Sequence, residues 1–163
     1  MKAEYSETQQ FRQTWIWILL AFIIGLVWHL FIQQIIFGNP LGNNPAPDSV
    51  MWIIWILFGI GMPIFMHTMK LTVEVGSEGI MIRFFPLHSR YVSFDDLKTL
   101  EAVKYNPIRD YGGWGLRWGR KGTAYNVSGN RGVLLELENG KHVMIGSQSP
   151  EKLAKMIGEA MKK

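Results

Sequence analysis

Two long stretches without charge constrain this chain more than any other feature. They read "WIWILLAFIIGLVWHLFIQQIIF" over residues 15–37 and "VMWIIWILFGIGMPIFMHTM" over residues 50–69, and Asp48 is the only formal charge between residues 13 and 69. A helix needs roughly 20 apolar residues to cross a hydrocarbon core. Neither stretch has the polar face of a helix packed on a soluble core. We therefore predict membrane-spanning helices over 14–37 and 50–69, rather than two buried helices of a soluble protein.

The flanks of these stretches predict their orientation. The first stretch exceeds the apolar core of a signal peptide and lacks a small-residue cleavage site, so we expect a retained anchor. Segment 38–49 holds no Lys or Arg, whereas Lys2 and Arg12 precede the first stretch and Lys70 follows the second. Positive charge marks the cytoplasmic side. Segments 1–13 and 70–163 are thus expected in the cytoplasm, and 38–49 outside it.

Residues 70–163 carry the alternating pattern of short strands. We expect seven strands, over 70–75, 80–86, 90–94, 97–105 and 114–118, with a pair within 132–146 joined by Asn139-Gly140. A helix should follow, with Ser149 as N-cap and Pro150 at its first position. Its apolar stripe contains Leu153, Met156, Ile157, Ala160 and Met161. The pattern predicts a small antiparallel barrel or sandwich plugged by that helix.

Several longer stretches resemble one superfamily. These are "GIMIRFFPLHSRYVSFDDL", "YNPIRDYGGWGLR", "GTAYNVSGNRGVLLELENGK" and "IGSQSPEKL". Together with two N-terminal spans they resemble membrane-anchored bacterial pleckstrin-homology-like proteins, in an uncharacterised branch with YGGWG and AYNVSGN elements. The resemblance implies two membrane helices followed by a seven-stranded pleckstrin-homology-like barrel capped by a C-terminal helix. It also implies the bacterial inner membrane as the location. Because such folds host many functions, it does not define an activity.

The glycine-rich run "YGGWGLRWGRKGTAYNVSGNRG", residues 111–132, raises the question of a phosphate-binding loop. A dinucleotide fingerprint needs G-x-G-x-x-G between a buried strand and a helix. Here Gly113, Gly115 and Gly119 give G-x-G-x-x-x-G, and no Gly-Lys-Ser/Thr follows. The glycines are more typical of strand bulges, hairpins and close backbone approach. We expect Trp114, Trp118 and Tyr125 to pack in the domain.

The same region holds the excess of positive charge. Residues 108–131 contain one acid, Asp110, and five basic side chains: Arg109, Arg117, Arg120, Lys121 and Arg131. A basic face close to an anionic leaflet attracts it. These five residues are the candidate contacts to a protein partner or an anionic lipid headgroup, with a merely solvated basic face as the alternative.

No catalytic or metal-binding motif emerges. The chain has no cysteine, its four histidines are scattered, and Ser128 has no adjacent base. Asp95-Asp96 is typical of a turn between strands. We predict no cofactor, no metal, no nucleic-acid partner and no enzymatic activity. The leading hypothesis is a membrane-tethered recognition or assembly domain. A small accessory subunit of a larger membrane complex, or a homo-oligomer, is the alternative, and an enzyme with an unrecognised site is a weaker one.

Overall fold

A computed structural model describes residues 4–119 and 122–162, which form two compact units. One unit is a helical hairpin built from residues 11–68. The other is a β domain, which combines residues 4–10 with the described residues that follow position 68. The β domain is therefore assembled from two segments of chain that lie on either side of the hairpin in the sequence.

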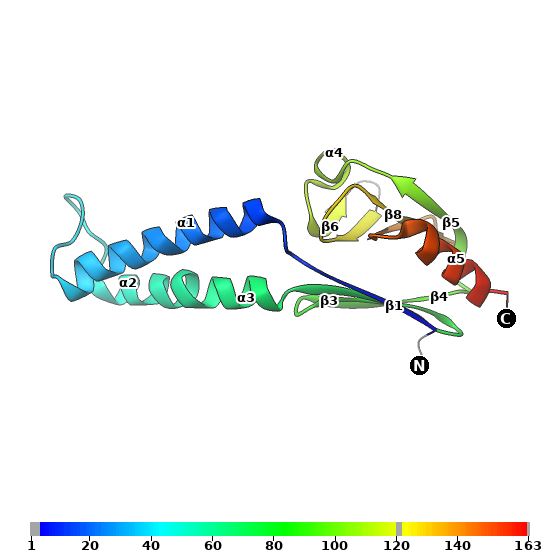
Figure 1. The fold of residues 1–163 in the computed structure, drawn as a ribbon, viewed down its shortest axis with the longest axis horizontal. Coiled ribbons are helices and arrows are strands. Elements are labelled where there is room, and N and C mark those ends of the chain that lie inside the picture. Colours follow the sequence, from blue (N-terminus) through cyan, green and yellow to red (C-terminus); the bar gives the residue numbers. More distant parts are fainter. Residues whose placement is uncertain (1–3, 120–121, 163) are drawn as a thin grey trace. The chain divides into compact units, whose positions relative to one another are not determined.

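The helical hairpin contains two long apolar helices. The first comprises α1 (Thr14–Phe31) and a π-helical continuation, η1 (Ile32–Ile36). The second comprises α2 (Asp48–Ile54), the π-helical segment η2 (Trp55–Gly61) and α3 (Met62–Thr68). Their mean hydropathies are 2.4 and 2.0, and each is long and apolar enough to cross a membrane. The two helices run antiparallel (Figure 1). Their bounds agree closely with the predicted 14–37 and 50–69.

Aromatic side chains join the two helices near the loop end of the hairpin. The Phe31 ring stacks on Trp55 at 4.5 Å between centroids and meets Trp52 edge-on at 4.8 Å. The indole N–H of Trp28 donates to the carbonyl oxygen of Gly59 at 3.2 Å. A Cβ added at Gly59 would lie 3.1 Å from Trp55 Cδ1 and 3.4 Å from Trp28 Nε1. Glycine at this position therefore lets the Trp28 indole of the first helix approach the backbone of the second.

The first sheet of the β domain includes a strand that precedes the hairpin. Its order is β1 (Tyr5–Gln10), β2 (Lys70–Val75), β3 (Gly79–Phe85) and β4 (His88–Ser93), all antiparallel. Gln10 pairs with Lys70, and Tyr5 pairs with Val75. Figure 1 shows β1 in dark blue alongside the green strands. The two helices are thus inserted where β1 and β2 would otherwise be joined by a hairpin turn.

The Glu7 carboxylate links β1 by hydrogen bonds to residues 147 and 148, near the C-terminal end of the chain. It accepts hydrogen bonds from Ser147 Oγ at 2.7 Å and from the backbone N–H of Gln148 at 2.9 Å. Gln9 Nε2 and the Tyr5 hydroxyl also donate to it, at 3.0 and 3.2 Å. Gln9 is 2% exposed, and its Nε2 additionally donates to the Gly146 carbonyl. This hydrogen-bonded network connects β1 with the segment that enters the last helix.

The second sheet has five strands. In spatial order they are β5 (Leu97–Lys104), β8 (Arg131–Leu137), β9 (His142–Gly146), β7 (Gly122–Asn126) and β6 (Gly115–Gly119). The pairing of β7 with β9 is parallel, and the other pairings are antiparallel. The prediction of a seven-stranded closed barrel was wrong, because the described residues form nine strands in two separate sheets. The strands missing from the prediction are β1 and β7.

The C-terminal helix α5 (Pro150–Ala160) covers the core, as predicted. It packs against β5 and β8 of the second sheet and against β2 of the first. Leu153 and Ile157 are fully buried. Ser149 is the N-cap and Pro150 begins the helix, as predicted, but the Ser149 side chain makes no capping hydrogen bond. Ser147 Oγ instead accepts from the Ser149 N–H at 3.0 Å, and the same hydroxyl donates to Glu7.

Candidate recognition surfaces

The five basic residues singled out in the sequence are dispersed over the elements that the structure describes. Arg109 is exposed on the short helix α4 (Pro107–Tyr111). Arg117 lies on the edge strand β6, and its Nε donates to the Trp114 carbonyl at 3.0 Å. Arg131 begins β8 and forms an ion pair with Glu151. Arg120 and Lys121 lie outside the described residues. Because β9 and β7 separate β8 from β6, Arg117 and Arg131 belong to strands roughly 14 Å apart.

The glycine-rich run forms the end of a helix and the antiparallel pair β6–β7. Gly112, with a φ of 77°, ends α4 in the left-handed conformation. A Cβ on Gly122 would lie 2.1 Å from the carbonyl oxygen of His142, so this position requires glycine. Close backbone approach was the predicted role of such glycines. The run contains no strand-to-helix phosphate loop among its described residues, since β6 and β7 follow α4.

The aromatic residues of this run have different environments. Tyr125 is 1% exposed and belongs to the core, as predicted. Trp114 donates its indole N–H to the Gly129 carbonyl at 2.9 Å. The prediction that Trp118 packs in the domain was wrong, because its side chain is 73% exposed on an edge strand. An exposed indole on an edge strand is a candidate contact for another molecule.

A basic hollow lies beside the β6–β7 turn. It measures about 320 Å³ and is lined by Arg90, Lys141 and His142 together with Gly119, Gly122, Thr123 and Gly140. No carboxylate lines it within the described residues. Glu136 pairs with His142 across the ladder, but its carboxylate is engaged by Lys98 at 2.7 Å. These side chains give the basic hollow the chemistry of a site for acidic groups.

A buried phenol connects the basic hollow to the core. The Tyr125 hydroxyl lies 3.3 Å from Nδ1 of His88 and is hydrogen bonded to Arg90. Burial raises the pKa of Tyr125 above its usual value, and the Arg90 charge opposes that rise. The His88 and Tyr125 rings are 5.9 Å apart. The buried Tyr125 therefore holds the Arg90 side chain in place, which limits the conformational freedom of that side chain before a ligand binds.

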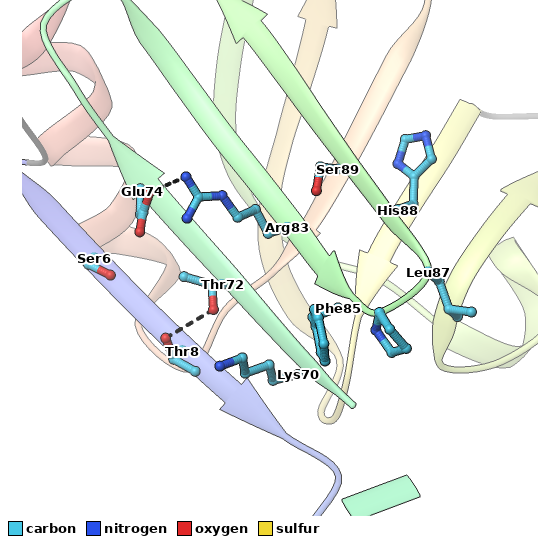
Figure 2. Close-up of a pocket in the computed structure, with 11 residues that line it drawn as sticks. Ser6, Thr8, Lys70, Thr72, Glu74, Arg83, Phe85, Leu87, His88 and Ser89 are labelled. Carbon is cyan, nitrogen blue, oxygen red and sulfur yellow. Dashed lines mark hydrogen bonds and ion pairs between the residues drawn. The ribbon is translucent and has the colours of Figure 1, made fainter. Parts of the chain in front are cut away.

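A second hollow, here named the outer groove, lies on the solvent-exposed face of the first sheet. It measures about 610 Å³. Its lining comprises Ser6, Thr8, Lys70, Thr72, Glu74, Arg83, Phe85, Pro86, Leu87, His88 and Ser89. Figure 2 shows Lys70 and Phe85 at one end of the outer groove and Glu74 with Ser6 toward the other. The Thr8 and Thr72 hydroxyls are 3.2 Å apart, and Arg83 pairs with Glu74 at 3.4 Å. Four of its eight polar side chains are thus already paired with one another.

Sequence reasoning missed α4, although its signals are local. Asn106 Oδ1 accepts from the Arg109 N–H at 3.0 Å, and Asp110 Oδ2 accepts from the Asn106 N–H at 2.9 Å. Asn106-Pro107 at the start and Gly112 after the end are the usual signals of helix boundaries. The helix covers the outer face of the second sheet, where Tyr105, Tyr111, Ala124 and Met144 form a small core. Within residues 4–119 and 122–162, no group of three His, Asp or Glu side chains is arranged to hold a metal ion.

The match to a family model covers nearly the whole chain. A model described as a family of unknown function (DUF6141) matches residues 3–163. The chain belongs to DUF6141. No curated protein matches its sequence. The description of DUF6141 names no activity, and membership of a family does not by itself define one.

Proposed function

We propose that this DUF6141 protein is a non-enzymatic membrane protein that recognises anionic lipid headgroups through its basic hollow. The two apolar helices cross the bilayer, and the β domain is a pleckstrin-homology-like module held at its surface. The observation that carries the proposal is the convergence of Arg90, Lys141 and His142 without a lining carboxylate in the described structure. The β-strand pairing of residues on both sides of the hairpin supports a common side for the two ends of the chain.

The position of the basic hollow along the first sheet also supports the proposal. Arg90 pairs with Ile82, three residues from Phe85, and Phe85 pairs with Lys70. Lys70 is two residues beyond the end of α3. Three residues of strand span about 10 Å, which is close to the Debye length of about 8 Å at physiological ionic strength. A cation at the surface of an anionic leaflet contributes about 1 kcal/mol of attraction, and ionic screening reduces this attraction over a distance of about 10 Å.

The orientation follows from the charge distribution. Arg12 and Lys70 flank the two apolar helices on the side of the β domain, whereas segment 38–49 has no Lys or Arg. We therefore propose a cytoplasmic β domain in a bacterial inner membrane, with both ends of the chain inside. Tethering makes the encounter between domain and headgroup two-dimensional, so a modest intrinsic affinity is sufficient.

Charge reversal at Lys141 tests the proposal. The full-length protein in neutral detergent micelles is titrated with short-chain phosphatidylglycerol, and binding is read from the rise in the unfolding temperature. Lys141→Glu replaces one attraction by one repulsion, or about 2 kcal/mol, so we expect about thirtyfold weaker binding. Lys162→Glu is the control, because Lys162 is exposed and lies outside the lining of the basic hollow.

Two results would refute headgroup recognition at this site. One is equal weakening by Lys141→Glu and Lys162→Glu, which would indicate a diffuse charge effect. The other is equal stabilisation by short-chain phosphatidylcholine, which would show that the negative charge of the headgroup is not recognised.

The exposed Trp118 favours a second candidate function, that of an accessory subunit. An indole that is 73% exposed on the edge strand β6 is a suitable centre for a protein interface. Under this proposal, gentle extraction from native membranes yields a complex, and Trp118→Ser releases the protein from it without lowering its unfolding temperature. Extraction of the wild-type protein as a monomer without copurifying protein would remove the basis for this candidate.

A further inference from the structure

The turn between β3 and β4 presents two large apolar side chains to solvent. Phe85 is 52% exposed and Leu87 is 53% exposed, whereas the neighbouring Phe84 is fully buried. The Leu87 N–H donates to the Phe84 carbonyl at 2.8 Å, which closes the turn around Pro86. The two apolar side chains are thus held outward by a hydrogen-bonded turn, here named the anchor turn (residues 85–87).

The register of the first sheet fixes the end at which the anchor turn lies. Phe85 pairs with Lys70, and Lys70 pairs with Gln10 on its other side. Lys70 follows the last residue of α3, Thr68, by two positions, and Gln10 precedes the first residue of α1, Thr14, by four. The anchor turn therefore occupies the end of the sheet from which the chain departs for both apolar helices.

Covalent connectivity limits how far the anchor turn can lie from the second helix. An extended chain covers at most about 3.6 Å per residue, so Lys70 lies within about 7 Å of Thr68. Its partner across the ladder is about 5 Å further away. This limit of about 12 Å between the Cα atoms of Thr68 and Phe85 holds for every arrangement of the β domain and the hairpin, because it depends on chain length and strand pairing alone. Leu87 is two residues further along, which adds at most about 7 Å.

The Lys70 ammonium group lies close to one of these apolar side chains, Phe85. The Lys70 ammonium lies 5.9 Å from the centroid of the Phe85 ring, and Figure 2 shows both side chains at the same end of the outer groove, with Leu87 on the adjoining turn. The one carboxylate that lines the described outer groove, Glu74, is paired with Arg83 and belongs to the fifth cross-strand pair from this end. An aromatic ring, an aliphatic side chain and an ammonium group next to a span end match the chemistry of the membrane interface.

We propose that the anchor turn is seated in the headgroup layer of the bilayer, with Phe85 and Leu87 directed toward the acyl chains and Lys70 at the level of the phosphates. This inference rests on the proposed membrane insertion of the two helices, but not on headgroup binding in the basic hollow. The anchor turn is a third attachment of the β domain, in addition to the two chain connections. It restricts rotation of the domain about those connections and so fixes the side of the first sheet that faces the membrane.

Single-cysteine labelling tests the position of the anchor turn, because the chain has no cysteine of its own. The full-length protein carrying Leu87→Cys is labelled with a nitroxide and reconstituted in phosphatidylcholine–phosphatidylglycerol vesicles. Its accessibility to oxygen, which concentrates in the bilayer, is compared with that to a water-soluble nickel chelate. The control is Ser77→Cys, in the turn between β2 and β3, which is exposed at the opposite end of the same sheet.

A third variant separates failure of this inference from failure of the proposed function. Ile56→Cys places the label on an exposed position in the middle of the second apolar helix. We expect the Ile56 and Leu87 labels to lose accessibility to the nickel chelate relative to the Ser77 label. If the Ile56 label is shielded while the Leu87 label is as accessible as the Ser77 label, the anchor-turn proposal is wrong. The proposal that the two helices cross the membrane then still stands. If the Ile56 label is also accessible, the helices do not cross the bilayer and both proposals fail.

Discussion

Removal of the Glu7 carboxylate is the most informative perturbation of the β domain. Glu7→Ala takes the acceptor away from four donors, of which Ser147 Oγ and the Gln148 N–H belong to the segment before α5. Ser147 and Gln9 are 6% and 2% exposed, so water cannot readily replace the carboxylate. A hydrogen bond to a charged group contributes about 1.5–3 kcal/mol, and the bonds of one network are not additive. We expect Glu7→Ala to lower the free energy of unfolding by about 3 kcal/mol.

The predicted loss can be measured as a melting temperature. In a domain of about 100 residues, 1 kcal/mol shifts the unfolding temperature by roughly 4–8 °C, so the expected decrease is roughly 12–24 °C. Near-ultraviolet circular dichroism of the full-length protein in detergent follows the unfolding. Amide hydrogen exchange should show lost protection in the β1–β2 ladder. The matched control is Glu101→Ala, which removes the same charge from an exposed position on β5. Equal melting temperatures for the two variants would refute the assigned role of Glu7.

Three further predictions follow from the fold. Gly59→Ala should weaken the helical hairpin, because the added methyl group meets two indoles, whereas Gly25→Ala has nothing within 4 Å and should be neutral; resistance of the hairpin to dodecyl sulfate distinguishes them. Replacement of residues 11–69 by a short turn containing Asn-Gly should give a folded, soluble β domain, because Gln10 and Lys70 are already paired; fragment 70–163, without β1, should not give the same dispersed NMR spectrum. Burial raises the pKa of Tyr105 and Tyr111 above 10, so the unfolded chain releases these protons first. The contribution of these two phenols to stability should therefore be constant below pH 10 and fall above it, with ionisation of Tyr105 and Tyr111 appearing together with unfolding; ionisation of these two phenols near pH 10 in the folded domain would contradict this.

Local sequence patterns were sufficient to predict several helices and strands. The two apolar helices were predictable because a span needs length and absence of charge, both of which are properties of a contiguous segment. The helix α5 was predictable from its stripe containing Leu153 and Ile157, and the β8–β9 hairpin from Asn139-Gly140. The turn itself differs in detail from the two-residue turn that Asn-Gly usually forms, in which both residues have a positive φ. Gly140 has a φ of 74°, whereas Asn139 has no positive φ, so one residue of the pair is left-handed rather than both.

The strand β1 was not predictable from its own sequence. "YSETQQ" is polar on both faces, and its inward face carries Glu7 and Gln9 because it meets the polar segment 146–148 rather than an apolar core. Alternation of apolar and polar residues, the signal of a half-buried strand, is therefore absent. The partner of β1 lies 60 residues further along the chain at Lys70, beyond the reach of any local pattern.

The candidate sites were likewise predictable only in part from the sequence. The sequence by itself determined that this is a chain with two apolar helices, a β-rich C-terminal region and an excess of positive charge, because these depend on composition and short-range periodicity. Tertiary structure decided which charges converge. Strand order separates Arg117 from Arg131, pairs Arg131 with Glu151, and brings Arg90 of β4 beside Lys141 and His142 of the β8–β9 region. It also placed Trp118 on an exposed edge and the anchor turn at the end of the sheet that joins both helices, since strand pairing connects residues that are far apart in sequence.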